Sequence, residues 1–259
     1  MGVFEWVAVV GAAAWVPHLA GLLYRLATKP KVTMIPVPEI EVGYTWLGPV
    51  VNIKASLFAE RKDALVLDMR MTLRHEKGKQ IALVWHSFVE KFSEMRDRSG
   101  EATEISRDQV ATALRLSTAV PTEKLIRFQD PGFQEKNRRL TADADGTLNR
   151  LKGVNPSGAP EAFLTSPEHE SLANQFKHDF PWEPGRYTVK LSVEILERKR
   201  PALAETSFEL STGDVERLRG NATLVVERIA KIAKVEKLED VQYQWATPRL
   251  RGKDIMVRK

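Results

Sequence analysis

The chain contains no cysteine among its 259 residues. This absence excludes disulfide bonds, thiolate zinc sites, iron–sulfur clusters and cysteine nucleophiles. It is compatible with a reducing compartment. Apolar residues make up 43% and charged residues 28% of the chain, which gives enough material for a folded core and is not typical of a disordered protein.

Motifs for catalysis and for cofactor binding are also missing. The glycines have neither P-loop nor dinucleotide-binding spacing. The acidic run at 143–146 lacks the third acidic position and the closing glutamate of a calcium loop. The five histidines show no metal-ligand spacing: His18, His75, His86, His169 and His178. We therefore expect no cofactor, no metal site and no enzymatic activity, with a motif-free hydrolase as an alternative.

One long apolar run lies near the start of the chain. Residues 3–24 read VFEWVAVVGAAAWVPHLAGLLY, with Glu5 as the only charged residue. A bilayer core needs about 20 apolar residues in a helix, so we predict a single-pass transmembrane anchor over residues 1–27. The candidate anchor residues are Trp6, Trp15, Leu19, Leu22, Leu23 and Tyr24. The bilayer is then the expected partner.

Two other interpretations of this run stay open. A cleaved signal peptide would have a basic start, which is absent here. A buried core helix is compatible with Pro17, which kinks or ends a helix. If the run is an anchor, Arg25, Lys29 and Lys31 on its C-terminal side predict a cytoplasmic domain with the N-terminus outside.

The next part of the chain has the alternation typical of β-strands. A proline-rich linker over 28–38 leads into an expected edge strand at 39–42. Val51, Ile53, Ala55 and Leu57 alternate with polar residues, and the apolar residues at odd positions from 65 to 73 do the same. With a third strand at 80–88, residues 48–90 predict an antiparallel meander.

A second strand pair lies further along the chain. Residues 188–196 alternate in the same way, and 205–210 form a last strand after a basic turn. Tyr187 stands at the start of this pair, directly after Pro184 and Gly185. We expect its hydroxyl to bond back to the chain at the corner of the sheet.

WEPGRYTVKLSVEIL followed by ETSFEL resembles the final strand pair of immunoglobulin-like and fibronectin-III-like β-sandwiches. GPVVNIKASLFAERKDALVLDMRMTLRHEKGK resembles their opening strands, so the resemblance covers about half of the chain. It implies a mainly β fold, an antiparallel immunoglobulin-like sandwich over 39–211, with the N-terminal transmembrane helix and a C-terminal helix. Such sandwiches are usually binding or spacer modules.

Residues 92–178 form a polar insertion in this predicted sandwich. Possible strands lie at 110–116 and 124–128, and a turn-rich, charged stretch follows from residue 129. Residues 167–176 predict a short helix with Ser166 as its N-cap. Because long loops in compact domains carry function or are disordered, we expect this insertion to build part of any binding face.

Residues 212–237 predict an amphipathic helix whose apolar seam is Val215, Leu218, Ala222, Val225, Ile229 and Ile232. This seam packs on the sandwich, or it mediates self-association or partner docking through 214–237. The basic tail spans 238–259, and its residues 249–259 supply +4 of the net charge of +5 through Arg249, Arg251, Lys253, Arg258 and Lys259. A solvated terminus or contact with anionic lipid is the expected role.

These features predict a membrane-anchored interaction or scaffold protein with a cytoplasmic β-sandwich, part of a larger complex with an unidentified protein. One alternative is an extracytoplasmic domain that binds envelope components. Another is a nucleic-acid-linked accessory protein acting through the tail. The balanced charge outside the tail argues against this second alternative.

Overall fold

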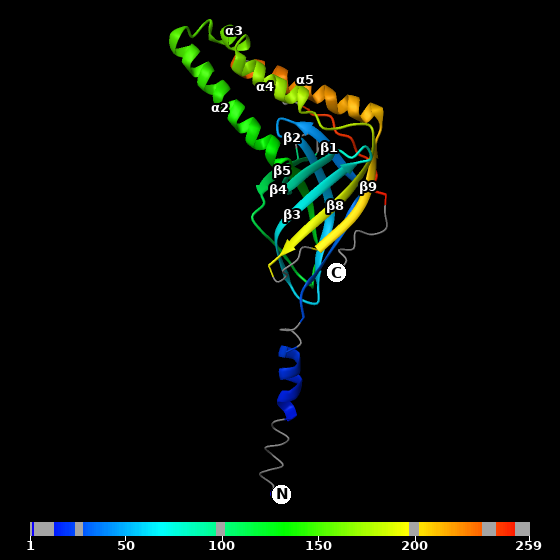
Figure 1. The fold of residues 1–259 in the computed structure, drawn as a ribbon. Coiled ribbons are helices and arrows are strands. Elements are labelled where there is room, and N and C mark those ends of the chain that lie inside the picture. Colours follow the sequence, from blue (N-terminus) through cyan, green and yellow to red (C-terminus); the bar gives the residue numbers. More distant parts are fainter. Residues whose placement is uncertain are drawn as a thin grey trace.

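The computed structural model describes Gly2 and residues 13–23, 28–96, 102–196, 202–234 and 242–251. In these residues one antiparallel sheet of nine strands curls around the apolar core, in the order β1-β2-β7-β4-β3-β8-β9, with β5 on β4 and β6 on β3 (Figure 1). The strands are β1 (Lys31–Thr45), β2 (Gly48–Glu60), β3 (Ala64–His75), β4 (Gln80–Arg96), β5 (Ala102–Val110), β6 (Leu114–Leu116), β7 (Thr122–Gln129), β8 (Gly185–Ile195) and β9 (Ala202–Leu210).

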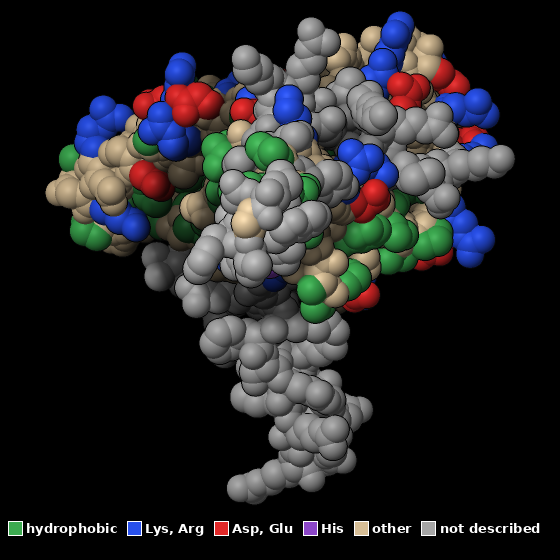
Figure 2. Space-filling model, turned by 90° about the horizontal axis from the view of Figure 1, so that it is seen from below, with side chains coloured by type: hydrophobic (Ala, Val, Ile, Leu, Met, Phe, Trp, Pro, Cys, Tyr) green, Lys and Arg blue, Asp and Glu red, His purple; other side chains and the backbone are tan. Residues whose placement is uncertain are grey.

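The helices gather at one end of this sheet (Figure 1). They are α2 (Pro131–Val154), α3 (Ala159–Leu164), α4 (Pro167–His178) and α5 (Thr212–Ala233). A further helix over residues 13–23 lies beyond the opposite end of the sheet. Figure 2 views the molecule from this opposite end and shows charged side chains of both signs around its periphery.

The predicted coarse architecture is confirmed: the described chain is mainly antiparallel β with a C-terminal helix. The strands form one curled sheet, and the assignment to the immunoglobulin-like fold stays a prediction. The predicted meander over 48–90 is wrong, because β7 lies between β2 and β4. β7 comes from the segment interpreted as a polar insertion, and its Ile126 and Phe128 are fully buried.

Alternation sets which side chains enter the core. In β2 the four residues predicted to face inward, Val51 to Leu57, are all buried. In β3 a register shift between Val66 and Asp68 moves the inward set by one position. As a result Val66 is buried, whereas Leu67, predicted to face inward, is 38% exposed. The strand β1 also begins at Lys31, so most of the predicted linker is strand.

The helix α2 was not predicted, because its sequence is rich in glycine and charge. Asp130 caps its start by accepting hydrogen bonds from the backbone amides of Gly132 and Phe133, and Pro131 occupies the first turn. Only a narrow set of side chains is buried along its 24 residues, including Phe133 and Leu148. The shorter helix α4 was predicted, and Ser166 caps it as expected.

The helix α5 is confirmed over Thr212–Ala233, and its start carries a capping box between Ser211 and Asp214. Five seam residues are buried within the molecule, while Ile232 is 45% exposed and Ala233 takes its place. The predicted residues 235–237 lie outside the described part of the chain. The apolar seam of α5 therefore packs into the core of this chain.

Residues 242–251 run between the two edges of the sheet. Ala246 exchanges two backbone hydrogen bonds with Val42 of β1, at N···O distances of 2.8 and 2.9 Å. Arg251 exchanges two with Ser207 of β9, at 2.6 and 3.3 Å. The C-terminal segment therefore covers backbone groups on both edge strands, which would otherwise be open to pairing with another chain.

The predicted corner at Tyr187 is confirmed. Its hydroxyl donates to the Glu183 carbonyl at 3.0 Å and accepts from the Glu183 amide at 2.8 Å. Burial raises the pKa of Tyr187 to about 12, and the charge of Glu183 acts in the same direction. The neutral phenol thus closes the loop that leads into β8.

We expect Tyr187→Phe to lower the free energy of unfolding by about 1–2 kcal/mol, because the Glu183 backbone groups lose their partner. The native state binds the phenol proton more tightly than the unfolded state, whose pKa is about 10. Stability from Tyr187 is therefore present below about pH 10 and is lost as the pH rises toward 12. Urea denaturation at about pH 8 and about pH 11 measures this loss, which should be smaller in the variant. An identical alkaline loss in both proteins would contradict the assignment.

Candidate functional site

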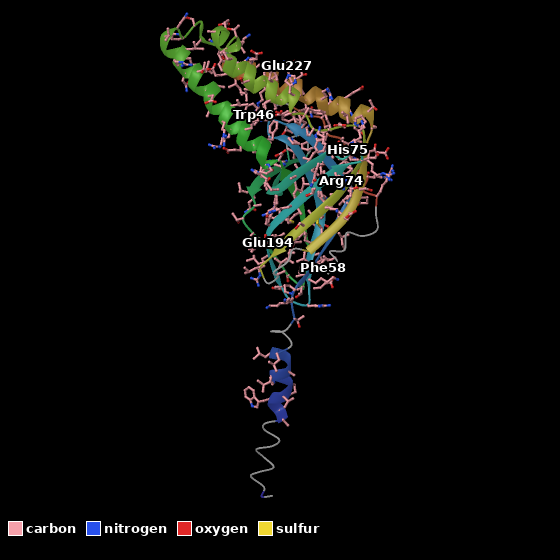
Figure 3. All side chains as sticks on the ribbon, in the orientation of Figure 1. Trp46, Phe58, Arg74, His75, Glu194 and Glu227 are labelled. Atoms are coloured by element: carbon pink, nitrogen blue, oxygen red, sulfur yellow. The ribbon has the colours of Figure 1, made fainter. Side chains whose placement is uncertain are left out.

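Two cavities share Trp46 at the end of the sheet that carries the helices (Figure 3). The first, here the cationic cavity, has a volume of about 480 Å³ and is lined by Thr45, Trp46, Leu47, Val50, Arg127, Arg228, Ile232, Tyr243 and Trp245. The second, here the polar cavity, has about 500 Å³ and is lined by Trp46, Val84, His86, Gln129, Pro131, Gln134, Glu135, Asn137, Arg138 and Thr141. Both volumes are in the range of small-molecule sites.

Trp46 belongs to the tight turn between β1 and β2, and the helices hold this turn in place. Its ring stacks on Phe176 of α4, with centroids 5.4 Å apart. Asn137 of α2 donates its side-chain amide to the Trp46 carbonyl at 3.2 Å. Gly48 closes the turn at φ 76°, where a Cβ atom would lie 2.3 Å from the Phe133 ring. Only glycine fits there, so the turn and α2 pack closely.

The polar cavity lies between α2 and the strands β4 and β7. Gln129 is 1% exposed, and neither its amide nitrogen nor its oxygen has a hydrogen-bond partner among the described residues. The Asn137 side-chain oxygen and the Thr141 hydroxyl are also buried without a partner there. Leaving a buried polar group unpaired costs about 1–3 kcal/mol, so this concentration of such groups calls for an explanation.

Two titratable residues line the polar cavity, Glu135 and His86, and each has one main charge state at neutral pH. Hydrogen bonds from Arg138 and Arg139 lower the pKa of Glu135 to about 2, so this carboxylate stays ionised at neutral pH. Desolvation lowers the pKa of His86, and the positive charge of Arg127 adds to this effect. His86 is therefore mainly neutral near pH 7. An ionised carboxylate held by two arginines is a poor general acid or base at this pH.

The cationic cavity combines aromatic rings with two guanidinium groups. Arg127 donates to the Asn52 side-chain oxygen at 3.2 Å and pairs with the Asp108 carboxylate. Arg228 of α5 makes no hydrogen bond or ion pair within the described residues, and the Tyr243 hydroxyl is buried without a partner. Such a wall suits an apolar molecule with one anionic group.

The predicted anchor residues lie far from these cavities. Trp15, Leu19, Leu22 and Leu23 belong to the helix at 13–23 and are 54–66% exposed, whereas Trp6 and Tyr24 lie outside the described residues. Within the described ranges, no helix combines the length and the apolar character required to cross a bilayer. The described helix covers only half of the predicted 22-residue run.

The basic tail is also placed only in part. Arg249 lies 3.4 Å from a Glu39 carboxylate oxygen, and Arg251 lies 2.9 Å from one of Glu209. Lys253, Arg258 and Lys259 lie outside the described residues. The side chains of both arginines are exposed to solvent, while the backbone of their segment pairs with the edges of the sheet.

No protein-family model matches the chain, and comparisons with curated proteins and with solved structures give no match. Within the described ranges, no three His, Asp or Glu side chains lie close enough to hold a metal ion. The site has therefore to be interpreted from its own geometry.

Neither cavity could be recognised from the sequence. Their lining residues come from distant parts of the chain, and Gln129, Asn137 and Trp46 match no motif. One signal was available: Asp130 and Pro131 form a helix start, which would have placed the following polar residues on one helix. The segment 92–178, expected to contribute to a binding face, does supply most of the polar cavity through β7 and α2.

Proposed function

We propose that the chain is a membrane-anchored binding protein that presents the Trp46 cavities on the side away from the bilayer. The exposed apolar helix carries this proposal. Every described residue from 13 to 23 is exposed, including Trp15 at 66% and Leu23 at 65%. Apolar side chains gathered in this way without cover mark a membrane or partner surface.

The sequence around the helix favours the lipid bilayer as the environment of its exposed apolar side chains. The apolar run extends over 6–24, and Pro17 and Gly21 are tolerated in membrane helices. Arg25, Lys29 and Lys31 follow it directly. These charges support a cytoplasmic position for the sheet, as the flanking-charge rule predicts.

Binding explains the opposite end of the molecule better than catalysis does. Both cavities are large enough for a small molecule, and the one carboxylate that lines the polar cavity is held by arginines. Nucleic-acid binding through the tail receives less support, since Arg249 and Arg251 already pair with acidic side chains of the sheet.

We expect the full chain to float with membranes in a density gradient and to resist extraction by alkaline carbonate. A chain that begins at residue 28 should move to the soluble fraction, because it lacks the apolar helix. Leu19→Arg with Leu22→Arg should act like the deletion, while His18→Ala serves as the matched control within the same helix. Recovery of the full chain in the soluble fraction would overturn the anchor.

The orientation has its own test. Reporters that are active only inside or only outside the cytoplasm are fused after residue 259. Activity of the cytoplasmic reporter supports the proposed topology. Activity of the external reporter would reverse it and favour an extracytoplasmic binding domain of the same fold.

A further inference from the structure

The end of the sheet that faces the helix at 13–23 carries exposed apolar side chains. This end, here the base, consists of the β2–β3 turn at 61–63, the loop at 117–121 and the end of β8 at residue 196 (Figure 1). Val120 is 65% exposed in the loop, and Leu196 is 60% exposed. Figure 2 looks onto this end and shows hydrophobic side chains beside charged ones. Apolar side chains exposed together at one end of a molecule are typical of a contact surface.

Hydrogen bonds hold the parts of the base in place. The Asp63 carboxylate accepts from the Thr118 backbone amide at 3.1 Å and from the Arg115 guanidinium at 3.2 Å. The Leu196 backbone amide donates to the Leu65 carbonyl at 3.0 Å. The loop at 117–121 and the end of β8 are thus both fixed to the start of β3.

The β2–β3 turn adds positive charge to the base. Arg61 and Lys62 are exposed and make no hydrogen bond or ion pair within the described residues. The carboxylates on either side of them are already paired, Glu60 with Lys31 at 2.9 Å and Asp63 with the arginine named above. Arg61 also has φ 73°, a conformation that is uncommon for residues other than glycine. The turn therefore presents two basic side chains that are available to an anionic partner.

Acidic side chains on the strands lie further from this turn. Glu123 of β7 stands opposite Ser56, and Glu194 of β8 stands opposite Asp68. Each lies four residues from the end of its partner strand at the base, which is about 13 Å along a strand. This distance exceeds the Debye length of about 8–10 Å at physiological salt. Among the described residues, the charge that the turn presents to a surface next to it is therefore positive.

The chain itself keeps the base close to the apolar run. The run ends at Tyr24, and Pro30, six residues later, is already buried in the fold. At full extension these two residues lie at most about 22 Å apart. The headgroup layer on each side of a bilayer is itself about 5–8 Å thick. With the run in the bilayer, the base is therefore held next to the headgroups.

We propose that the base docks on the surface of the bilayer that holds the apolar helix. Val120 and Leu196 enter the interfacial layer, and Arg61 and Lys62 contact anionic lipid headgroups. Apolar area together with basic side chains is the combination that binds such surfaces. This inference rests on the proposed membrane anchor and extends it, because the anchor alone leaves the sheet without a fixed orientation. Docking directs the Trp46 cavities away from the membrane.

The absence of cysteine makes the test direct, since one introduced cysteine takes one NBD fluorophore. Val120→Cys labels the base, and Val154→Cys, at the far end of α2, is the matched control. The full chain is placed in nanodiscs of phosphatidylcholine and phosphatidylglycerol, in which part of the lipid carries a nitroxide on its headgroup. We expect the nitroxide to quench the label at position 120 and to leave the label at position 154 nearly unchanged.

A charge variant tests the basic side chains in the same nanodiscs. Each basic residue at an anionic surface favours the docked state about fivefold, so Arg61→Gln with Lys62→Gln should shift the equilibrium about 25-fold toward the undocked state. Most of the quenching at position 120 should then be lost. Lys231→Gln with Lys234→Gln removes the same charge from exposed positions on α5 and just after it, and should leave the quenching unchanged.

The outcomes separate docking from anchoring. Equal quenching at positions 120 and 154, in nanodiscs that hold the chain, would overturn the docking and leave the anchor standing. Undiminished quenching in Arg61→Gln with Lys62→Gln would overturn the proposed contact with anionic lipid. If the chain does not stay with the nanodiscs, the anchor and the docking fail together.

Discussion

A chain that ends at residue 241 should not form a stable monomer. It lacks the segment that makes six backbone hydrogen bonds to β1 and β9 and that buries Ala246 completely. It also lacks the Gln244 backbone, which exchanges two hydrogen bonds with the buried Asn221 of α5. At about 1 kcal/mol for each bond, the loss is roughly 5–10 kcal/mol, comparable with the whole stability of a typical domain.

The two edge strands left open by this truncation favour pairing between molecules. Size-exclusion chromatography and urea denaturation should show aggregates and no cooperative transition. A chain that ends at residue 252 is the matched control, because it keeps every described contact of the segment and removes only 253–259. Cooperative unfolding of the shorter chain at the same urea concentration as the control would contradict this role.

Phe176→Ala should destabilise the protein by about 3–5 kcal/mol, the usual cost of removing a fully buried aromatic side chain. The ring joins the helices to the sheet. It contacts Tyr44 and Phe133 edge-on, with centroids 6.4 and 5.4 Å away, and stacks on Trp46. Its loss leaves a cavity between α4 and the β1–β2 turn.

The same substitution should disturb the candidate site, because Trp46 loses its stacking partner. We therefore expect a red shift of tryptophan emission together with the loss of stability in urea denaturation. Val154→Ala at the end of α2 is the control: this side chain is 84% exposed, and its replacement should change stability by less than about 0.5 kcal/mol. A similar, small effect of both substitutions would show that the aromatic cluster does not connect the helices to the sheet.

The sequence was most informative where side-chain periodicity is local. The strand β2, the pair β8 and β9, the Tyr187 corner and the buried seam of α5 could all be predicted, because each depends on residues a few positions apart. The position of β7 could not, since its pairing with β2 joins residues that are far apart in the chain. Local pattern contains no information about which strands that are distant in sequence become neighbours.

The cavities were missed for a related reason. Gln129 is polar and ends a short strand, so in sequence it resembles a surface residue, yet the start of α2 and the Trp46 turn bury it. The helix α2 itself was hidden by its glycines and charges, and its narrow buried face gives a weak periodic signal. A buried polar side chain without a partner can be recognised only after the fold has brought its neighbours together.

The C-terminal segment also fixes the order in which the chain can be completed. The outer backbone groups of both edge strands pair only with residues 246–251, which are synthesised after all the strands of the sheet. Until then β1 and β9 have no partner on their outer sides, although most of the core strands are already synthesised. The native sheet is therefore completed only after its last strand and α5 have been synthesised. During synthesis its unpaired edges are natural targets for chaperones that shield exposed strands.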